Sequence, residues 1–132
     1  MNNIIIQATN STPAVEFKKE GKLFIEGRSL PENAMDFYQP LIEWAGKFKS
    51  SDVKLDINLE YLNSGSIKKL LELLKVFDAN NLIKTFYVDW HYDQDDEDIL
   101  ENVQIFEEIL KKAQFRYHEL SKDAWSAWNR QN

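Results

Sequence analysis

The chain has 132 residues, 43% of them hydrophobic and 13% aromatic, with a net charge of −6 and a pI of about 4.9. This length suits one domain with a sizeable core, and the acidic balance argues against nucleic acid as a partner. The absence of cysteine excludes disulfides and thiolate metal sites and fits the cytoplasm. No apolar run reaches the roughly 20 residues of a membrane span, and residues 1–6 lack the basic start of a signal peptide.

The first part of the chain predicts three strands. Ile4 and Ile6 indicate a first strand, and residues 14–27, "AVEFKKEGKLFIEG", alternate in the manner of a hairpin. Glu20 and Gly21 make its turn. We therefore expect an antiparallel pair at the N-terminal end of the sheet.

A helix should follow Ser29-Leu30-Pro31-Glu32, which has the form of a capping box. The serine would cap the helix, and Glu32 would reach back to it. Pro40 lies inside the helical pattern, so we expect a kink or break near Phe37.

The remainder alternates between strands and helices. The pattern "DVKLDINLE" at 52–60 predicts a strand with one apolar face and one wet or ion-paired face. The other expected elements are a helix over 64–79, a strand over 83–90, a helix with Ile99, Val103, Phe106 and Leu110 facing inward, and a strand over 115–120.

The expected order is β-β-β-α-β-α-β-α-β, which predicts a single α/β domain over residues 1–120. Strands separated by helices are usually parallel, so the sheet should be mixed, with an antiparallel N-terminal hairpin and three helices mainly on one face. Residues 121–132 form a separate tail that contains Trp125 and Trp128. Their spacing of three suits one helical face that docks on the open side of the sheet or on a partner.

This topology brings the carboxyl ends of three strands to one edge of the sheet. Arg28, Asn63–Ser66 and His91–Tyr92 should lie along that edge, where α/β sheets usually bind their ligands. Ser64 would stand at the N-terminus of the second helix, whose free N–H groups favour an anion.

Ser64 and Ser66 have three interpretations. Serine is a preferred helix cap. As a nucleophile it would need a base, and among the two histidines His91 is the one expected at this edge. As a phosphoacceptor, a serine at a helix start gains about −1.5 to −2 charges in a favourable place and changes any surface that docks over it.

The other candidates for chemistry have simpler interpretations. The acidic run Asp93, Asp95, Asp96, Glu97 and Asp98 lacks the central glycine and final glutamate of a calcium loop. His91 and His118 lack the partners of a zinc site. Asp56 and Glu60 share a strand face, where a solvated surface beside Lys54 is the default. We therefore expect no metal, no cofactor and no catalytic residue.

Three stretches of the chain resemble the SiaC family of bacterial regulatory phosphoproteins. They are "GRSLPENAMDFYQPLIEW" (27–44), "LEYLNSGSIKKLLELLKVFD" (59–78) and "VDWHYDQDDEDILENVQIFEEIL" (88–110). The specific elements are G-R-S-x-P-E-N, F-Y-x-P-L-x-x-W and L-E-Y-x-N-[ST], in this order. The resemblance runs from about Thr12 to Tyr117 and leaves the tryptophan-containing tail outside.

The resemblance implies a STAS-like regulatory domain that is not an enzyme. A Ser/Thr kinase phosphorylates the residue after the asparagine of L-E-Y-x-N, and a PP2C-like phosphatase removes the phosphate. The unphosphorylated form binds and activates a diguanylate cyclase, which raises cyclic-di-GMP and favours biofilm formation. The phosphoacceptor here would be Ser64, with Ser66 as second choice, because the usual Thr-Ser-Ser is replaced by Ser-Gly-Ser.

We therefore expect a cytoplasmic adaptor that inserts in no membrane and binds its partners around the start of the second helix. The predicted partner-binding residues are Arg28, Tyr61, Asn63, Ser64, Gly65, Ser66 and Lys68. The alternative is a constitutive binding module that uses the same edge, or the tail, without phosphorylation.

Overall fold

The computed structural model describes residues 1–96 and 98–120. Within them the chain forms six strands and three helices: β1 (Ile4–Ile6), β2 (Ala14–Phe17), β3 (Lys22–Ser29), α1 (Ala34–Gly46), β4 (Asp52–Leu62), α2 (Ser64–Ala79), β5 (Thr85–Asp93), α3 (Asp98–Ile109) and β6 (Gln114–Leu120). The predicted order of elements is confirmed. Trp125 and Trp128 lie outside the described residues.

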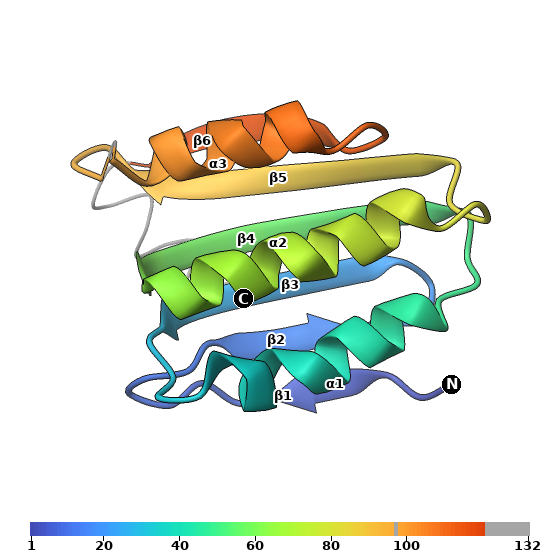
Figure 1. Cartoon of the computed structure of the whole chain (residues 1–132), viewed down its shortest axis with the longest axis horizontal. Helices are drawn as coiled ribbons and strands as arrows, with labels where there is room; N and C mark the ends of the chain where they lie inside the picture. The colour runs from blue at the N-terminus through green and yellow to red at the C-terminus, as the bar shows by residue number, and fades with distance from the viewer. Residues whose placement is uncertain (97, 121–132) are drawn as a thin grey trace.

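The strands form one mixed sheet in the order β1-β2-β3-β4-β5-β6 (Figure 1). β1, β2 and β3 are joined by antiparallel pairing, whereas β3 to β6 run parallel to one another. Each parallel pair is linked by a helix, as a parallel connection requires. The mixed sheet and the N-terminal hairpin therefore agree with the prediction.

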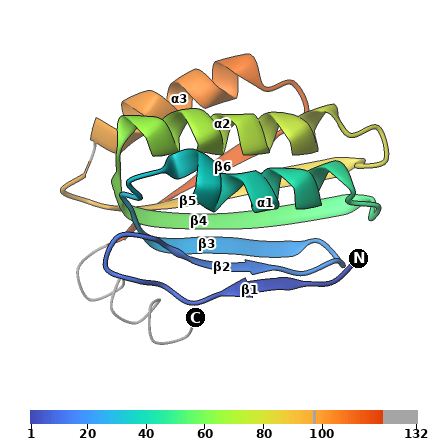
Figure 2. The same cartoon turned by 60° about the horizontal axis from the view of Figure 1, so that its bottom comes forward.

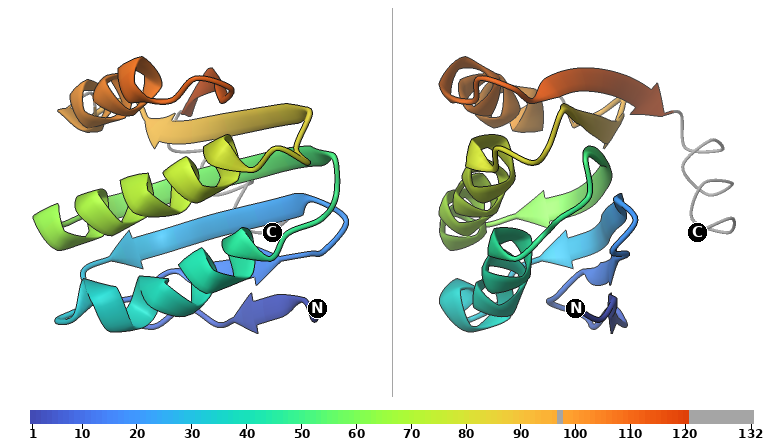
Figure 3. Two further views of the ribbon diagram at one scale, coloured as in Figure 1. Left: turned by 45° about the vertical axis from the view of Figure 1, so that its right-hand side comes forward. Right: turned by 90° about the vertical axis from the view of Figure 1, so that its right-hand side faces the viewer.

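All three helices cover the same face of the sheet, and the core lies between the two layers (Figures 2 and 3). The apolar side of β4 points into this core, with Val53, Leu55, Ile57 and Leu59 at most 3% exposed. None of the helices in the described part of the chain is long and apolar enough to cross a bilayer.

The second helix is anchored at its C-terminal end by Phe77 and Asp78. The Phe77 ring contacts Phe17, Phe48 and Phe86 with centroids 6.2, 5.9 and 5.8 Å away. The carboxylate of Asp78 accepts hydrogen bonds of 2.8 to 2.9 Å from the three backbone N–H groups of residues 111–113. These contacts fix the axis of α2 and thereby the position of its first turn at the other end.

The predicted capping box before α1 is wrong. The helix begins at Ala34, and its cap is Asn33, whose Oδ1 accepts a hydrogen bond of 3.2 Å from the N–H of Asp36. Ser29 is instead the last residue of β3, and its hydroxyl points into the protein. A tertiary hydrogen bond has replaced the local one that the motif suggested.

Of the kink or break predicted near Phe37, the break is absent. The helix is continuous from Ala34 to Gly46 with Pro40 inside it. Proline removes one N–H, whose partner would have been the carbonyl of Asp36 in the first turn. Burial of Tyr38, Leu41 and Ala45 at 0% exposure holds the helix against the sheet in spite of that loss.

The face of the sheet away from the helices carries an ion-pair network. Asp89 is 3% exposed and accepts two hydrogen bonds from Arg116, at 2.7 and 2.8 Å, and one from His118 at 2.9 Å. Asp56 bonds Lys54 and His91, each at 2.9 Å. Burial by itself raises the pKa of both carboxyls, but these hydrogen bonds outweigh it and hold both pKa values below the usual range.

Gly21 and Gly46 give a matched test of the turn between β2 and β3. Gly21 has a φ of 104°, and an added Cβ would collide with the carbonyl oxygen of Asp52. We expect Gly21→Ala to lower the free energy of unfolding by about 1–3 kcal/mol. Gly46→Ala, in open space at the end of α1, should raise it by about 0.5–1 kcal/mol. Urea unfolding followed by circular dichroism measures both, and equal effects would contradict the predicted turn strain.

The ion pairs of Asp89 should make the free energy of unfolding depend on pH in the acidic range. A carboxyl with a lowered folded-state pKa stabilises the fold above its unfolded pKa of about 3.9, and this contribution disappears as the pH falls through the folded value. We expect Asp89→Asn to lower the free energy of unfolding at pH 7 by about 1–3 kcal/mol. The difference from wild type should shrink below about pH 4.

The control for this measurement is Glu108→Gln, which changes an exposed carboxylate with no hydrogen bond or ion pair to the rest of residues 1–96 and 98–120. Urea titrations at a series of pH values give both comparisons. A loss of stability in Asp89→Asn that stays constant down to pH 2 would contradict the predicted linkage.

Candidate functional site

The first turn of α2 directly follows the end of β4, and Asn63 caps it. The Oδ1 atom of Asn63 accepts a hydrogen bond of 2.9 Å from the N–H of Ser66. Its Nδ2 atom donates to the carbonyl of Pro31 at 3.4 Å, which ties the cap to the segment between β3 and α1. The interpretation of Ser64 as the helix cap is therefore wrong, because Asn63 already has that role and Ser64 is the first residue of the helix.

Ser64 and Ser66 differ completely in access. The Ser64 residue is exposed, and no hydrogen bond ties its side chain to the other described residues. Ser66 is 0% exposed, and its Oγ accepts a hydrogen bond of 2.8 Å from the hydroxyl of Ser29. A protein partner can reach Ser64 directly, whereas Ser66 is closed off by the start of α1 and the end of β3.

Gly65 lets the first turns of α1 and α2 lie close together. A Cβ on Gly65 would be 3.4 Å from the Cβ of Ala34. Met35 follows Ala34 in the first turn of α1 and is 56% exposed. Leu30 directly follows β3 and Tyr61 lies near the end of β4, and they are 38% and 47% exposed. We call these three exposed residues at the helix and strand ends the apolar rim: Leu30, Met35 and Tyr61. Sequence reasoning missed Leu30 and Met35, because their exposure and the approach of α1 to α2 at Gly65 are properties of the tertiary structure.

Two cations flank this rim. Arg28 pairs with Tyr61 across β3 and β4, and its guanidinium lies 4.8 Å from the centre of the Tyr61 ring and 4.0 Å from Glu60. Lys68 is exposed one turn beyond Ser64 and forms no ion pair with the other described residues. The predicted residues Arg28, Tyr61, Asn63, Ser64, Gly65 and Lys68 thus gather at one end of the molecule.

The two histidines lie elsewhere, on the open face of the sheet. β5 continues to Asp93, so His91 is inside the strand rather than at its end, where the sequence prediction placed it. Its Nε2 bonds Asp56, and its ring stacks on that of His118 with centroids 4.7 Å apart. The helices cover the opposite face, so the structure does not bring His91 to Ser64 as a base.

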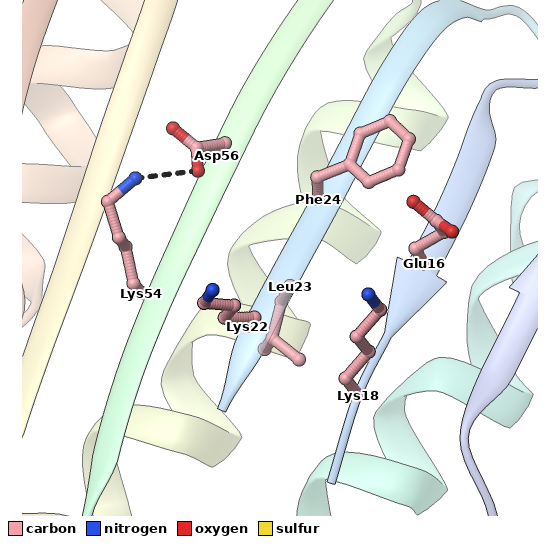
Figure 4. A pocket seen from close by; sticks show the side chains of 7 residues that line it. All are labelled: Glu16, Lys18, Lys22, Leu23, Phe24, Lys54 and Asp56. Carbon is pink, nitrogen blue, oxygen red and sulfur yellow. Dashed lines mark hydrogen bonds and ion pairs between the residues drawn. The ribbon is translucent and has the colours of Figure 1, made fainter. Parts of the chain in front are cut away.

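The open face also bears a hollow of about 290 Å³ (Figure 4). Its lining residues are Glu16, Lys18, Lys22, Leu23, Phe24, Lys54 and Asp56. The Asp56 carboxylate is engaged by Lys54 and His91, and Glu60 lies beside Arg28, so these two acids do not form a carboxylate pair. Among residues 1–96 and 98–120 no group of three or more His, Asp or Glu side chains could hold a metal ion.

A second hollow, of about 280 Å³, lies next to Tyr61 between the end of β4 and the start of α3. Its lining residues are Glu60, Tyr61, Leu62, Asp96, Asp98, Ile99 and Asn102. Burial, together with the charges of Asp98 and Asp93, raises the pKa of Asp96. The site around Ser64 is therefore apolar at its rim and acidic on the side of α3, a property that spacing in the sequence does not reveal.

Comparison with known proteins matches the fold over most of the chain. Residues 6–120 match the family described as SiaC family regulatory phosphoprotein. An uncharacterised protein of Pseudomonas aeruginosa strain UCBPP-PA14 is 32% identical over 113 residues, which cover 82% of this chain and 90% of that protein. SiaC of Pseudomonas aeruginosa has a solved structure that matches with a TM-score of 0.71 and 27% identity over 92% of this chain and 99% of that chain.

A further match comes from a crystal structure of the diguanylate cyclase SiaD in complex with its activator SiaC from Pseudomonas aeruginosa. The matching chain has a TM-score of 0.69 and 28% identity, and the match covers 89% of this chain and 98% of that chain. The family match spans every strand from β2 to β6, all three helices and the whole surface around Ser64. The chain therefore belongs to the SiaC family of regulatory phosphoproteins.

Proposed function

We propose that this chain is a non-enzymatic bacterial signalling adaptor of the cytoplasm, switched by reversible phosphorylation of Ser64. In its unphosphorylated form it binds and regulates a diguanylate cyclase, and so controls cyclic-di-GMP and biofilm formation. The crystal structure of SiaD with its activator SiaC supports this class of partner. A Ser/Thr kinase adds the phosphate, and a PP2C-like phosphatase removes it.

The observation that carries the proposal is the exposure of Ser64 at the first position of α2, at the end of the molecule that also carries the exposed residues of the apolar rim. Exposed apolar groups that cluster beside one another mark surfaces for protein partners. A neutral hydroxyl on such a surface can be covered at small cost when it finds a hydrogen bond. The unphosphorylated surface is therefore well suited to an interface.

Phosphorylation would change this surface without unfolding it. The first N–H groups of a helix have no intrahelical partners and favour an anion, and Lys68 lies one turn further along the same helix. Burying the doubly charged phosphate of phosphoserine in an interface is costly in free energy of binding unless the partner supplies cations. A coupling of only about 1–3 kcal/mol already changes affinity about 5- to 150-fold.

The transfer itself needs no chemistry from this chain beyond the Ser64 hydroxyl. Its Oγ forms a bond to the γ-phosphorus of ATP, and the bond from that phosphorus to the β,γ-bridging oxygen breaks. The hydroxyl proton passes to a base of the kinase, and ADP leaves. The phosphatase reverses the state by hydrolysing the phosphate ester with water.

We expect protein purified from its own cells to carry one phosphate on the peptide that contains Ser64, and Ser64→Ala to lack it. With the diguanylate cyclases of the same organism, Ser64→Ala should bind and activate its partner, whereas Ser64→Asp should bind about 5- to 150-fold more weakly. Peptide mass spectrometry, binding titrations and cyclase turnover provide the three measurements.

Gln104→Glu is the matched control, because it adds one negative charge at an exposed position of α3. It should bind like the wild type. A phosphate on Ser66 instead of Ser64 would refute the residue assignment. Partner binding without any phosphate under several growth conditions would favour the constitutive binding module.

Arg28 and Lys68 should respond to the phosphate. In protein phosphorylated on Ser64, we expect Lys68→Ala to lower the free energy of unfolding by about 0.3–0.5 kcal/mol more than in unphosphorylated protein. Arg28→Ala should also lower it further in the phosphorylated form, because its guanidinium would move from Glu60 to the stronger anion. Lys75→Ala, at an exposed position in a later turn of α2, should show no such difference. Thermal unfolding of both forms of each variant would test this, and identical shifts for all three variants would exclude the contacts.

A further inference from the structure

Three buried hydroxyls join the segments that surround the first turn of α2. They belong to Tyr38 of α1, Ser29 at the end of β3 and Ser66 of α2, and all three residues are 0% exposed. The Oη of Tyr38 is 2.6 Å from the Oγ of Ser29, which is 2.8 Å from the Oγ of Ser66. We call this set the hydroxyl chain.

The protons of the hydroxyl chain can be assigned. The Ser29 hydroxyl donates to Ser66, and a serine hydroxyl has a single proton. Tyr38 must therefore donate to Ser29, so the order of donation is Tyr38 to Ser29 to Ser66. Burial raises the pKa of Tyr38, more than the neighbouring Ser29 and Ser66 hydroxyls lower it, so the phenol keeps the proton that it donates.

The arrangement closes off the oxygen of Ser66 on the side that faces the sheet and α1. Its Oγ is fully buried and accepts a hydrogen bond, and its N–H is held by Asn63. Removal of one hydroxyl would leave another buried polar group without a partner, which is more costly than the loss of an exposed hydrogen bond. The first turn of α2 is thus fixed from three directions, with Ser66 inward and Ser64 outward.

We propose that the hydroxyl chain is a positioning device that restricts phosphorylation in this turn to Ser64, with Tyr38 as a specificity-determining residue. The inference rests on the proposed function for its biological meaning, but the geometry can be tested without a kinase. Tyr38 comes from α1, whose first turn carries Met35 of the apolar rim. The same hydroxyls therefore tie this part of the docking surface to the turn that bears the phosphoacceptor.

The test uses single cysteines, since the chain has none of its own. Ser64→Cys and Ser66→Cys are each labelled with an aromatic disulfide reagent under native conditions. We expect Ser64→Cys to react much faster than Ser66→Cys. In Ser66→Cys the sulfur is still a weak acceptor for the Ser29 hydroxyl, and the Tyr38–Ser29 hydrogen bond is kept. In the Tyr38→Phe background, labelling of Ser66→Cys should rise by roughly 2- to 12-fold, the factor that the net contribution of one hydrogen bond gives. Labelling of Ser64→Cys should not change.

A remote variant separates a local effect from general loss of stability. Val103→Ala removes core contacts of α3, where Val103 is 0% exposed, and makes no change in the hydroxyl chain. It should leave the ratio of the two labelling rates unchanged. If Tyr38→Phe does not fold, Ser29→Ala serves for the same comparison. Equal labelling of the two cysteines in the wild-type background, or an equal rise in Tyr38→Phe and Val103→Ala, would overturn the proposal.

A second readout follows the phosphate itself. Lysate of the source organism with ATP should phosphorylate Ser64 in the wild-type chain and both Ser64 and Ser66 in Tyr38→Phe, as read by peptide mass spectrometry. If the wild-type chain takes up no phosphate, the proposed switch fails while the labelling result stands. If labelling shows an open Ser66 in Tyr38→Phe but phosphate remains confined to Ser64, Tyr38 does not determine specificity and the proposal fails.

Discussion

The parallel pairing of β3 with β4 is the constraint on which the rest of the site depends. It places Ser29 beside Leu62, at the strand ends, and the N–H of Asn63 then donates to the carbonyl of Ser29 at 3.2 Å. The chain then continues into α2 on the same face of the sheet as α1 (Figures 2 and 3). The close approach at Gly65 and the contact of Ser29 with Ser66 both follow from that geometry.

The two faces of the sheet differ in chemical character. The face under the helices is apolar and holds α2 by Phe77 and Asp78 at one end and by the hydroxyl chain at the other. On the opposite face, the carboxylates of Asp89 and Asp56 are each bound by neighbouring cations. The end of the molecule that carries the apolar rim also carries the exposed hydroxyl of Ser64, which is why the proposed partner is assigned to that end.

The elements of this fold were predictable because alternation and helical periodicity are strong in this chain. Val53 to Leu59 show their buried face without any knowledge of the neighbours, and the order of strands and helices then implies parallel pairing. The failures have a common cause. Ser29 looks like a cap and Pro40 like a break when only local contacts are considered, but packing against distant residues decides both. The sequence already favoured Ser64 over Ser66 as the phosphoacceptor, but the burial of Ser66 against Ser29 becomes visible only in the tertiary structure.

A switch needs a large change in the free energy of binding and a small change in the fold. Ser64 suits both conditions, because its hydroxyl is exposed and contributes nothing to the core, and the proposed partner would cover it. A phosphate on Ser66 would require the hydroxyl chain to open. It would therefore lower the stability of the fold rather than change only the affinity for the partner. A buried polar anchor at Ser66, two residues from the exposed acceptor Ser64, would thus separate stability from regulation.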